Sequence, residues 1–474
     1  MNSVKKELFS GVMLTAFGKY SYLVINILIT ALLARILTPA DFGIVAIAIV
    51  IINFFSMLSD MGIGPAVVQN KNLEDDDIIS LHNLTLYIGA FLSIAFFLLA
   101  PVFARYYGSV KLIAIVQIFS ISIFFHCADI VPRNLIVKAK RFSFIACSNV
   151  LIQIVSGIIS VIAAYMGLGV YSLLIQPVLS SFLIYVVDIS QHWMLPSFLV
   201  KKTAVKKIFN YSLYQFLFSF INYFSRNLDK LVVGKVFGVN DLGYYEKSYR
   251  LMMLPVGNLS HVITPAIQPI FSEFQNDKQL LFQRSLRLFR VFAMMGFPIS
   301  VFLYFCSEEI ILIAFGNQWY GVIPVFQILS LSVGFQMIFS PQGAFFQSAN
   351  AVKEMFYCGI VTAALNVVSV LVGCVVLKDV KILSWMIVLS YILAFFVTYF
   401  VMMKRVFHAS FIHFLGVLLN PIILSVLISI SLYVISPFLV GCNILLSIGV
   451  KAILCFCVIG VFELKTKAIR KIIR

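Results

Sequence analysis

Stretches of about 20 apolar residues recur from near the start of the chain to near its end, and they restrict its fold more than any other feature. A helix needs about 20 residues to cross the hydrocarbon core of a bilayer. Only 11% of the 474 residues are charged, whereas soluble domains have about 25%. The runs also lack the period-2 alternation of membrane β-strands. The sequence therefore predicts an all-α polytopic membrane protein.

We expect about 14 transmembrane helices, joined by short connections. The apolar run that follows the N-terminus is too long for a signal-peptide core and has no clean cleavage site, so we expect the first helix to be retained. The predicted spans are 11–34, 42–59, 79–103, 112–131, 144–166, 170–188, 208–237, 251–270, 288–306, 321–346, 355–377, 382–403, 411–435 and 441–462.

The net charge of +16 would suggest nucleic acid in a soluble protein, but here the positions of the basic residues indicate membrane topology. With a cytoplasmic N-terminus, 23 Lys and Arg residues fall on inward segments and eight on outward segments. Cytoplasmic loops of membrane proteins carry such an excess. We therefore predict that both termini are cytoplasmic, that the basic tail after Lys465 contacts anionic lipid, and that the protein binds no nucleic acid.

The chain also resembles itself at offsets of 200 and 210 residues. Each matched pair lies at the same span within its half, which predicts two lobes of parallel topology. The matches are Leu33–Gly43 with Val233–Gly243, Ile63–Ala66 with Ile263–Ala266, and Gln117–Ser122 with Gln327–Ser332.

The repeats predict two six-helix lobes around a central cavity, with two further helices at the C-terminus. The expected divisions are an N-lobe over 1–190, a cytoplasmic linker over 191–207, a C-lobe over 208–405, and the last two helices with the basic tail over 406–474.

Three charged residues lie well inside the predicted span 208–237. Asn222, Arg226, Asp229 and Lys230 share one face of a helix. Each charge costs about 2.5–3.5 kcal/mol at the centre of a bilayer. We therefore expect this face to line a water-filled cavity and to present positive charge to an anionic substrate. Alternatively, Asp229 neutralises one of the two cations as a structural pair, which leaves one net positive charge.

Other polar residues inside the predicted spans are weaker candidates. Lys19 either lines the cavity or extends its ammonium group to the cytoplasmic interface, and Asn26 lies two turns further along the same face. Asp60 and His261 are candidate carriers of a coupling ion or proton. Asp60 can equally serve in a helix–helix contact, and His261 can equally be a satisfied core group.

The sequence shows no arrangement that would support catalysis. It has no nucleophile–base pattern, no phosphate-binding loop and no metal-ligand cluster, and its eight cysteines are mostly scattered within apolar runs. We therefore expect no enzymatic activity, no cofactor and no metal.

Four ordered motifs occur along the chain: Leu32–Ala46, Asp60–Gln69, Arg226–Asp229 with Gly234, and Phe315–Trp319 with Pro324. Together they resemble the bacterial polysaccharide flippases of the Wzx type, in the MOP superfamily. The resemblance extends over nearly the whole chain and is greatest to the branch that handles colanic-acid-type and teichuronic-type exopolysaccharides.

The resemblance implies a multi-pass flippase of the bacterial inner membrane. Such a protein moves undecaprenyl-pyrophosphate-linked oligosaccharide repeat units from the cytoplasmic to the periplasmic leaflet by alternating access, for export of cell-surface polysaccharide. The implied partners are the lipid-linked oligosaccharide, membrane lipids, and polymerase or assembly proteins. Arg226 carries over through its own motif as a basic cavity residue, whereas Lys19 has no motif match.

Two other functions are compatible with a polytopic helical chain. A MATE-like exporter of drugs or cations shares the two-lobe architecture, but a cation site favours carboxylates over a surplus of Arg and Lys. A membrane glycan polymerase or ligase is expected to carry a sizeable outer loop, and the sequence predicts none.

Overall fold

The structure is a computed structural model that describes residues 2–60, 63–70, 73–192, 194, 200–201, 223, 227–272, 274–275 and 277–466. All regular secondary structure in these ranges is helical. Within them, 11 helices are long and apolar enough to cross a membrane. The number becomes 12 if the bent pair Val322–Ser330 and Val333–Ser348 is one span.

These helices coincide with the predicted spans except at two places. The predicted span 208–237 lies mostly outside the described residues. The predicted span 251–270 falls within the 34-residue helix α9 (Val239–Ser272), whose first half carries several charged residues. The all-α membrane class is confirmed, and the number of 14 spans stays a prediction.

The chain divides into two compact units, Met1–Gly243 and Tyr244–Arg474. The predicted linker over 191–207 lies mostly outside the described residues, so the predicted lobe boundaries stay predictions.

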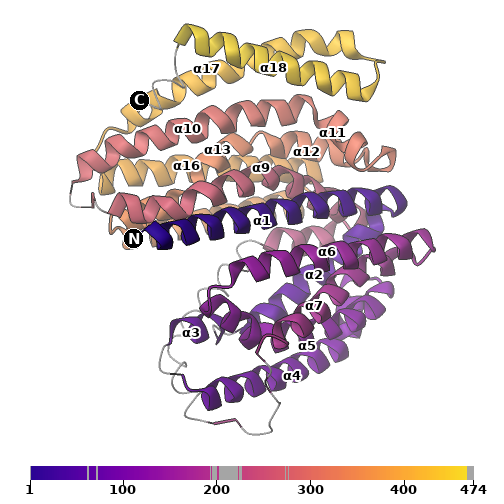
Figure 1. Ribbon diagram of the computed structural model, residues 1–474. Helices are drawn as coiled ribbons and strands as arrows, with labels where there is room; N and C mark the ends of the chain where they lie inside the picture. Colours follow the sequence, from indigo (N-terminus) through magenta and orange to yellow (C-terminus); the bar gives the residue numbers. More distant parts are fainter. Residues whose placement is uncertain are drawn as a thin grey trace. The chain divides into compact units, whose positions relative to one another are not determined.

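The first unit is built around α5, which packs against α2, α3, α4 and α7, while α1 packs against α6 (Figure 1). Fully buried apolar side chains on α5 face several of these neighbours, as a central helix requires. The helices are α1 (Asn2–Ile36), α2 (Pro39–Asp60), α3 (Ile63–Gln69), α4 (Asp75–Tyr107), α5 (Lys111–Lys138), α6 (Phe142–Tyr165) and α7 (Ser172–Ile189).

The ends of α4 follow from its sequence. Its first turn holds Asp75, Asp76 and Asp77, whose negative charge is favourable at the N-terminus of a helix. It ends at Gly108, whose φ of 68° is left-handed and is reached readily by glycine. These boundaries place the aromatic residues of the last turns of α4 at one end of the unit.

The second unit packs α10 against α13 and α17, α15 against α16, and α17 against α18. An aromatic cluster forms its core: the Phe289 ring lies 4.7 Å from Phe345, 5.1 Å from Tyr399 and 5.4 Å from Phe414, measured between centroids. After α9, the helices are α10 (Lys278–Phe305), α11 (Ser307–Ala314), α12 (Val322–Ser330), α13 (Val333–Phe339), α14 (Gln342–Ser348), α15 (Val352–Leu371), α16 (Val380–Val401), α17 (Phe411–Ile435) and α18 (Ile444–Thr466).

One local contact occurs separately in both units. In the first, the Ser93 hydroxyl on α4 donates to the carbonyl of Ser120 on α5 at 2.6 Å. In the second, the Ser300 hydroxyl on α10 donates to the carbonyl of Ser330, the last residue of α12, also at 2.6 Å. Ser120 and Ser330 are aligned by the sequence repeat. The shared contact is consistent with that repeat, while the two six-helix lobes stay a prediction.

Candidate substrate-binding region

The described part of the charged segment is helical from residue 227 to residue 236. Asp229 is buried and Lys230 is half-buried. The side-chain amide of Asn227 donates to the carbonyl of Tyr223 at 3.0 Å, one turn earlier. Arg226 and Asn222, which the sequence places on the same face, lie outside the described residues.

This segment contacts α2 and α4. A Cβ added to Gly234 would lie 3.3 Å from Cγ1 of Ile47 on α2, so the segment approaches that helix closely. The Tyr107 hydroxyl at the end of α4 donates to the carbonyl of Leu231 at 3.5 Å. Both contacts hold the part of the helix that carries Asp229 and Lys230.

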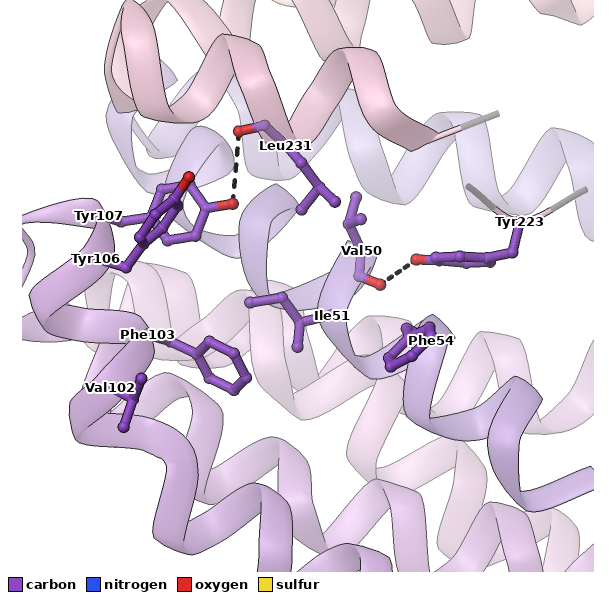
Figure 2. Close-up of a pocket in the computed structure, with 9 residues that line it drawn as sticks. All are labelled: Val50, Ile51, Phe54, Val102, Phe103, Tyr106, Tyr107, Tyr223 and Leu231. Atoms are coloured by element: carbon purple, nitrogen blue, oxygen red, sulfur yellow. Dashed lines mark hydrogen bonds between the residues drawn. The ribbon is translucent and has the colours of Figure 1, made fainter. Parts of the chain in front are cut away.

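A cavity of about 360 Å³ lies beside this segment, within the first unit (Figure 2). Its walls are apolar and aromatic, and in Figure 2 the Tyr223 hydroxyl donates to the carbonyl of Val50. The lining residues are Val50, Ile51 and Phe54 of α2, Val102, Phe103, Tyr106 and Tyr107 of α4, and Tyr223 and Leu231.

A cation lies next to this aromatic pocket. The exposed Lys235, one turn beyond Leu231, donates to the carbonyl of Tyr106, and its Nζ lies 4.4 Å from the centre of the Tyr106 ring. Lys230 directly precedes the lining residue Leu231. The arrangement places positive charge beside an apolar wall, which suits an amphiphile with an anionic head and a hydrocarbon chain.

The predicted residues of the first span lie on α1. Lys19 is exposed and Asn26 is half-buried. A Cβ added to Gly18 would lie 2.6 Å from Cβ of Ala146, so α1 contacts α6 directly beside Lys19. A cavity role for Lys19 and Asn26 stays a prediction.

The two candidate ion carriers differ in what surrounds them. Asp60 is the last residue of α2, and its Oδ1 accepts a hydrogen bond from the Gly64 amide at 3.2 Å, so it bridges the break before α3. His126 on α5 interacts electrostatically with it. His261 lies on α9, and its side chain is outside the described part of the structure. Ion coupling by either residue stays a prediction.

The sequence did not identify a buried polar network in the first unit. Arg133 on α5 donates to Oδ2 of Asp188 on α7 at 2.9 Å and to Oδ1 of Asn149 on α6 at 2.8 Å. Asp129 lies one turn before Arg133. Arg133 contributed to the prediction only as a topology signal, because it follows the end of the predicted span 112–131. Its spacing of four residues from Asp129, inside that span, could have indicated a paired charge.

A second buried pair connects α11 and α18 in the second unit. Lys451 forms an ion pair with Oε1 of Glu309 and donates to the carbonyl of Phe305 at 2.9 Å. Ser447 donates to the same carboxylate oxygen at 2.7 Å. Lys451 is 6% exposed and Glu309 is 7% exposed. The charge inside the last predicted span is therefore neutralised by a partner 142 residues earlier.

The Phe315–Trp319 motif builds a packed aromatic group. Trp319 is fully buried, with its ring 5.5 Å from Phe315 and 6.4 Å from Tyr244 between centroids. The Nζ of the buried Lys247 lies 5.8 Å from the centre of the Phe315 ring. Gly321 is in contact with the Tyr244 ring, where an added Cβ would lie 2.5 Å away. This motif stabilises the second unit.

Comparisons with known proteins agree with this architecture. A family model described as "Polysaccharide biosynthesis protein" matches residues 32–324. The chain is 24% identical over 364 residues to the teichuronic acid biosynthesis protein TuaB of Bacillus subtilis (strain 168), covering 75% of this chain and 74% of that protein. It is 22% identical over 438 residues to the lipopolysaccharide biosynthesis protein WzxC of Escherichia coli (strain K12), covering 89% of this chain and 86% of that protein.

The fold is also similar to that of a solved structure. The lipid II flippase MurJ, in an inward closed conformation, matches with a TM-score of 0.70 and 15% sequence identity, over 98% of this chain and 100% of that one. At this identity the match concerns the fold.

Proposed function

The chain belongs to the family of polysaccharide biosynthesis proteins, and from this premise we propose that it is an inner-membrane flippase for a lipid-linked oligosaccharide. It moves undecaprenyl-pyrophosphate-linked repeat units from the cytoplasmic to the periplasmic leaflet by alternating access. Both termini are cytoplasmic, and polymerase or assembly proteins receive the product. The names of the relatives refer to teichuronic acid and lipopolysaccharide biosynthesis, which supports a polysaccharide precursor as the substrate.

One observation carries this proposal: a charged helical face adjoins an aromatic pocket. Lys230 and the buried Asp229 lie one turn after Arg226 in sequence, and Leu231 lines the pocket. At an effective dielectric constant of about 20, a cation about 4 Å from a phosphate charge contributes about 4 kcal/mol before desolvation. Moving a polar headgroup through bare hydrocarbon would cost more free energy than moving it along a path lined by such cations.

In this proposal Arg226 and Lys230 bind the pyrophosphate, and Asp229 orients them. Asn222, Lys19 and Asn26 line the path of the glycan. Asp60 and His261 remain candidates for ion coupling. The pocket provides an apolar wall for the first isoprenoid units while the rest of the chain stays in lipid.

The test is reconstitution of the full chain in liposomes with a defined undecaprenyl-pyrophosphate-linked oligosaccharide. A membrane-impermeant glycosidase measures how much glycan reaches the opposite leaflet, with and without proton or sodium gradients. We expect faster transfer than in liposomes without protein. If lipid-linked glycans stay in their leaflet while a cationic dye is exported, the MATE-like alternative is supported instead.

The pocket is tested by filling it. Val102→Trp places an indole into the aromatic pocket, and we expect it to slow the transfer of the lipid-linked glycan. Val110→Trp, at a residue that is 82% exposed, is the matched control for the added bulk. Equal transfer rates for the two variants would contradict a role for the pocket.

A further inference from the structure

The network around Asp129 joins three helices of the first unit. Asp129 and Arg133 lie on α5, Asn149 on α6 and Asp188 on α7. Asp129 is 9% exposed and Asp188 is fully buried. Four groups of this polarity rarely meet in an apolar interior unless their charges balance.

Asp129 and Asp188 interact electrostatically, and both are buried beside a single guanidinium, that of Arg133. If both carboxyl groups were ionised, one buried negative charge would be left without a counter-charge. A proton on one of the two groups removes that charge. Arg133, which also contacts Asp188 at 2.9 Å, then balances the single remaining negative charge.

Each carboxyl group also has an oxygen that is open to a further partner. Oδ1 of Asp129 and Oδ1 of Asp188 are buried, and within the described residues neither accepts a hydrogen bond. A buried acceptor without a donor is destabilising, and more so when its group is charged. A proton on either carboxyl group removes the charge of that group.

The ligand is a proton rather than a metal ion. The guanidinium of Arg133 already occupies one side of the pair and repels a cation. Among the described residues, no group of three or more His, Cys, Asp or Glu is placed to hold a metal.

Other titratable groups surround the pair on the helices that pack against α5. Tyr185 on α7 interacts electrostatically with Asp129, and His82 on α4 stacks on Tyr185 with centroids 6.4 Å apart. On the side of α2, Asp60 faces His126. No Asp, Glu, His, Lys or Arg lies in α3, and α6 contributes Asn149.

We propose that Asp129 and Asp188 form a proton-binding site, in which the two carboxyl groups share one proton and Arg133 neutralises the remaining charge. Loss of the proton leaves two carboxylates facing one guanidinium, which weakens the contact between α5 and α7. The site lies near the ends of these helices that the charge distribution predicts to be cytoplasmic. In a transporter of the proposed function, this site takes up the coupling proton, and that step rests on the proposed function.

The test is infrared difference spectroscopy on the purified full chain in nanodiscs during a pH titration. We expect wild type to show the carbonyl band of a buried protonated carboxyl group, and the band to disappear when the shared proton is released. Asp129→Asn, whose amide can still donate to Asp188, removes the band. Asp76→Asn is the control, because Asp76 is 70% exposed and pairs with Lys201 at the surface.

Asp188→Asn is the second variant, and thermal unfolding reports whether each variant is folded. A wild type without the band, or a band that persists in both Asp129→Asn and Asp188→Asn, would overturn the proposal. The spectra do not depend on transport. Liposomes that fail to move lipid-linked glycan would contradict the proposed function and leave this result standing.

Discussion

Gly43 and Gly243 approach each other at a reciprocal helix contact in the first unit. A Cβ added to Gly43 would lie 1.7 Å from the carbonyl oxygen of Val239, and one added to Gly243 would lie 2.2 Å from the carbonyl oxygen of Pro39. The sequence repeat aligns Pro39 with Val239 and Gly43 with Gly243. The contact is therefore symmetric in the repeat, and only glycine leaves room for the two backbones.

Alanine at either glycine should destabilise the protein, because no backbone shift of a few tenths of an ångström relieves a contact below 3.0 Å. We expect Gly43→Ala to cost about 1–3 kcal/mol or more, as overpacking does. The melting temperature of the purified protein in detergent measures this loss of stability. Gly359→Ala on α15 is the control, because a Cβ there meets nothing within 4 Å and alanine favours a helix by up to about 1 kcal/mol. Equal melting temperatures for the two variants would contradict the contact.

Breaking the pair of Lys451 and Glu309 should destabilise the second unit. Glu309→Gln leaves a buried ammonium group without its counter-ion, which typically costs about 3–5 kcal/mol. The apolar double variant Lys451→Met with Glu309→Leu should recover most of this loss. Thermal unfolding compares the three proteins. A double variant that is stable but inactive in glycan transfer would show that the pair also serves transport.

The stability of the protein should rise with pH above neutrality because of Lys247. Burial lowers the pKa of Lys247 to about 7, against the favourable influence of Glu246. At pH values between this folded-state pKa and the higher pKa of an unfolded lysine, the unfolded chain binds more protons than the folded protein. The free energy of unfolding therefore increases with pH by up to about 1.4 kcal/mol per pH unit. Lys247→Met should lack this slope, whereas Lys404→Met, at an exposed position, should retain it. If the free energy of unfolding changed with pH in the same way for wild type and Lys247→Met, Lys247 would not be the cause of the slope.

Replacing Arg226 should stop glycan transfer. Because the sequence places Arg226 deep in a span and within a family motif, Arg226→Ala should abolish export of the lipid-linked glycan while the protein remains in the membrane. Arg226→Lys should retain part of the activity, since lysine also supplies positive charge. Equal loss in both variants would indicate bidentate geometry. Polymer yield and an immunoblot of the membrane fraction measure these outcomes, and a normal yield from Arg226→Ala would exclude the residue from the mechanism.

The sequence predicted the positions of the helices far better than the pairs of side chains that meet between them. Apolar runs define a span by themselves. The repeat aligned Gly43 with Gly243, but only the structure shows that the two backbones meet there. The partner of Lys451 was missed because Glu309 lies in a short helix outside the predicted spans. Likewise, Asp188 is 55 residues from Arg133. Helical periodicity indicates which residues share a face, but the neighbour that this face meets depends on tertiary packing.

The carbonyl of Ser330 ends a helix that bends by 48° before the next one begins. Inside a membrane, a carbonyl released by such a break would lack a donor, and the Ser300 hydroxyl supplies one at 2.6 Å. The turn residues Leu331 and Ser332 form their own short-range hydrogen bonds. The broken span therefore turns by 48° while the Ser330 carbonyl and the Leu331 and Ser332 amides keep hydrogen-bond partners inside the protein, so the bend leaves none of these three groups to lipid.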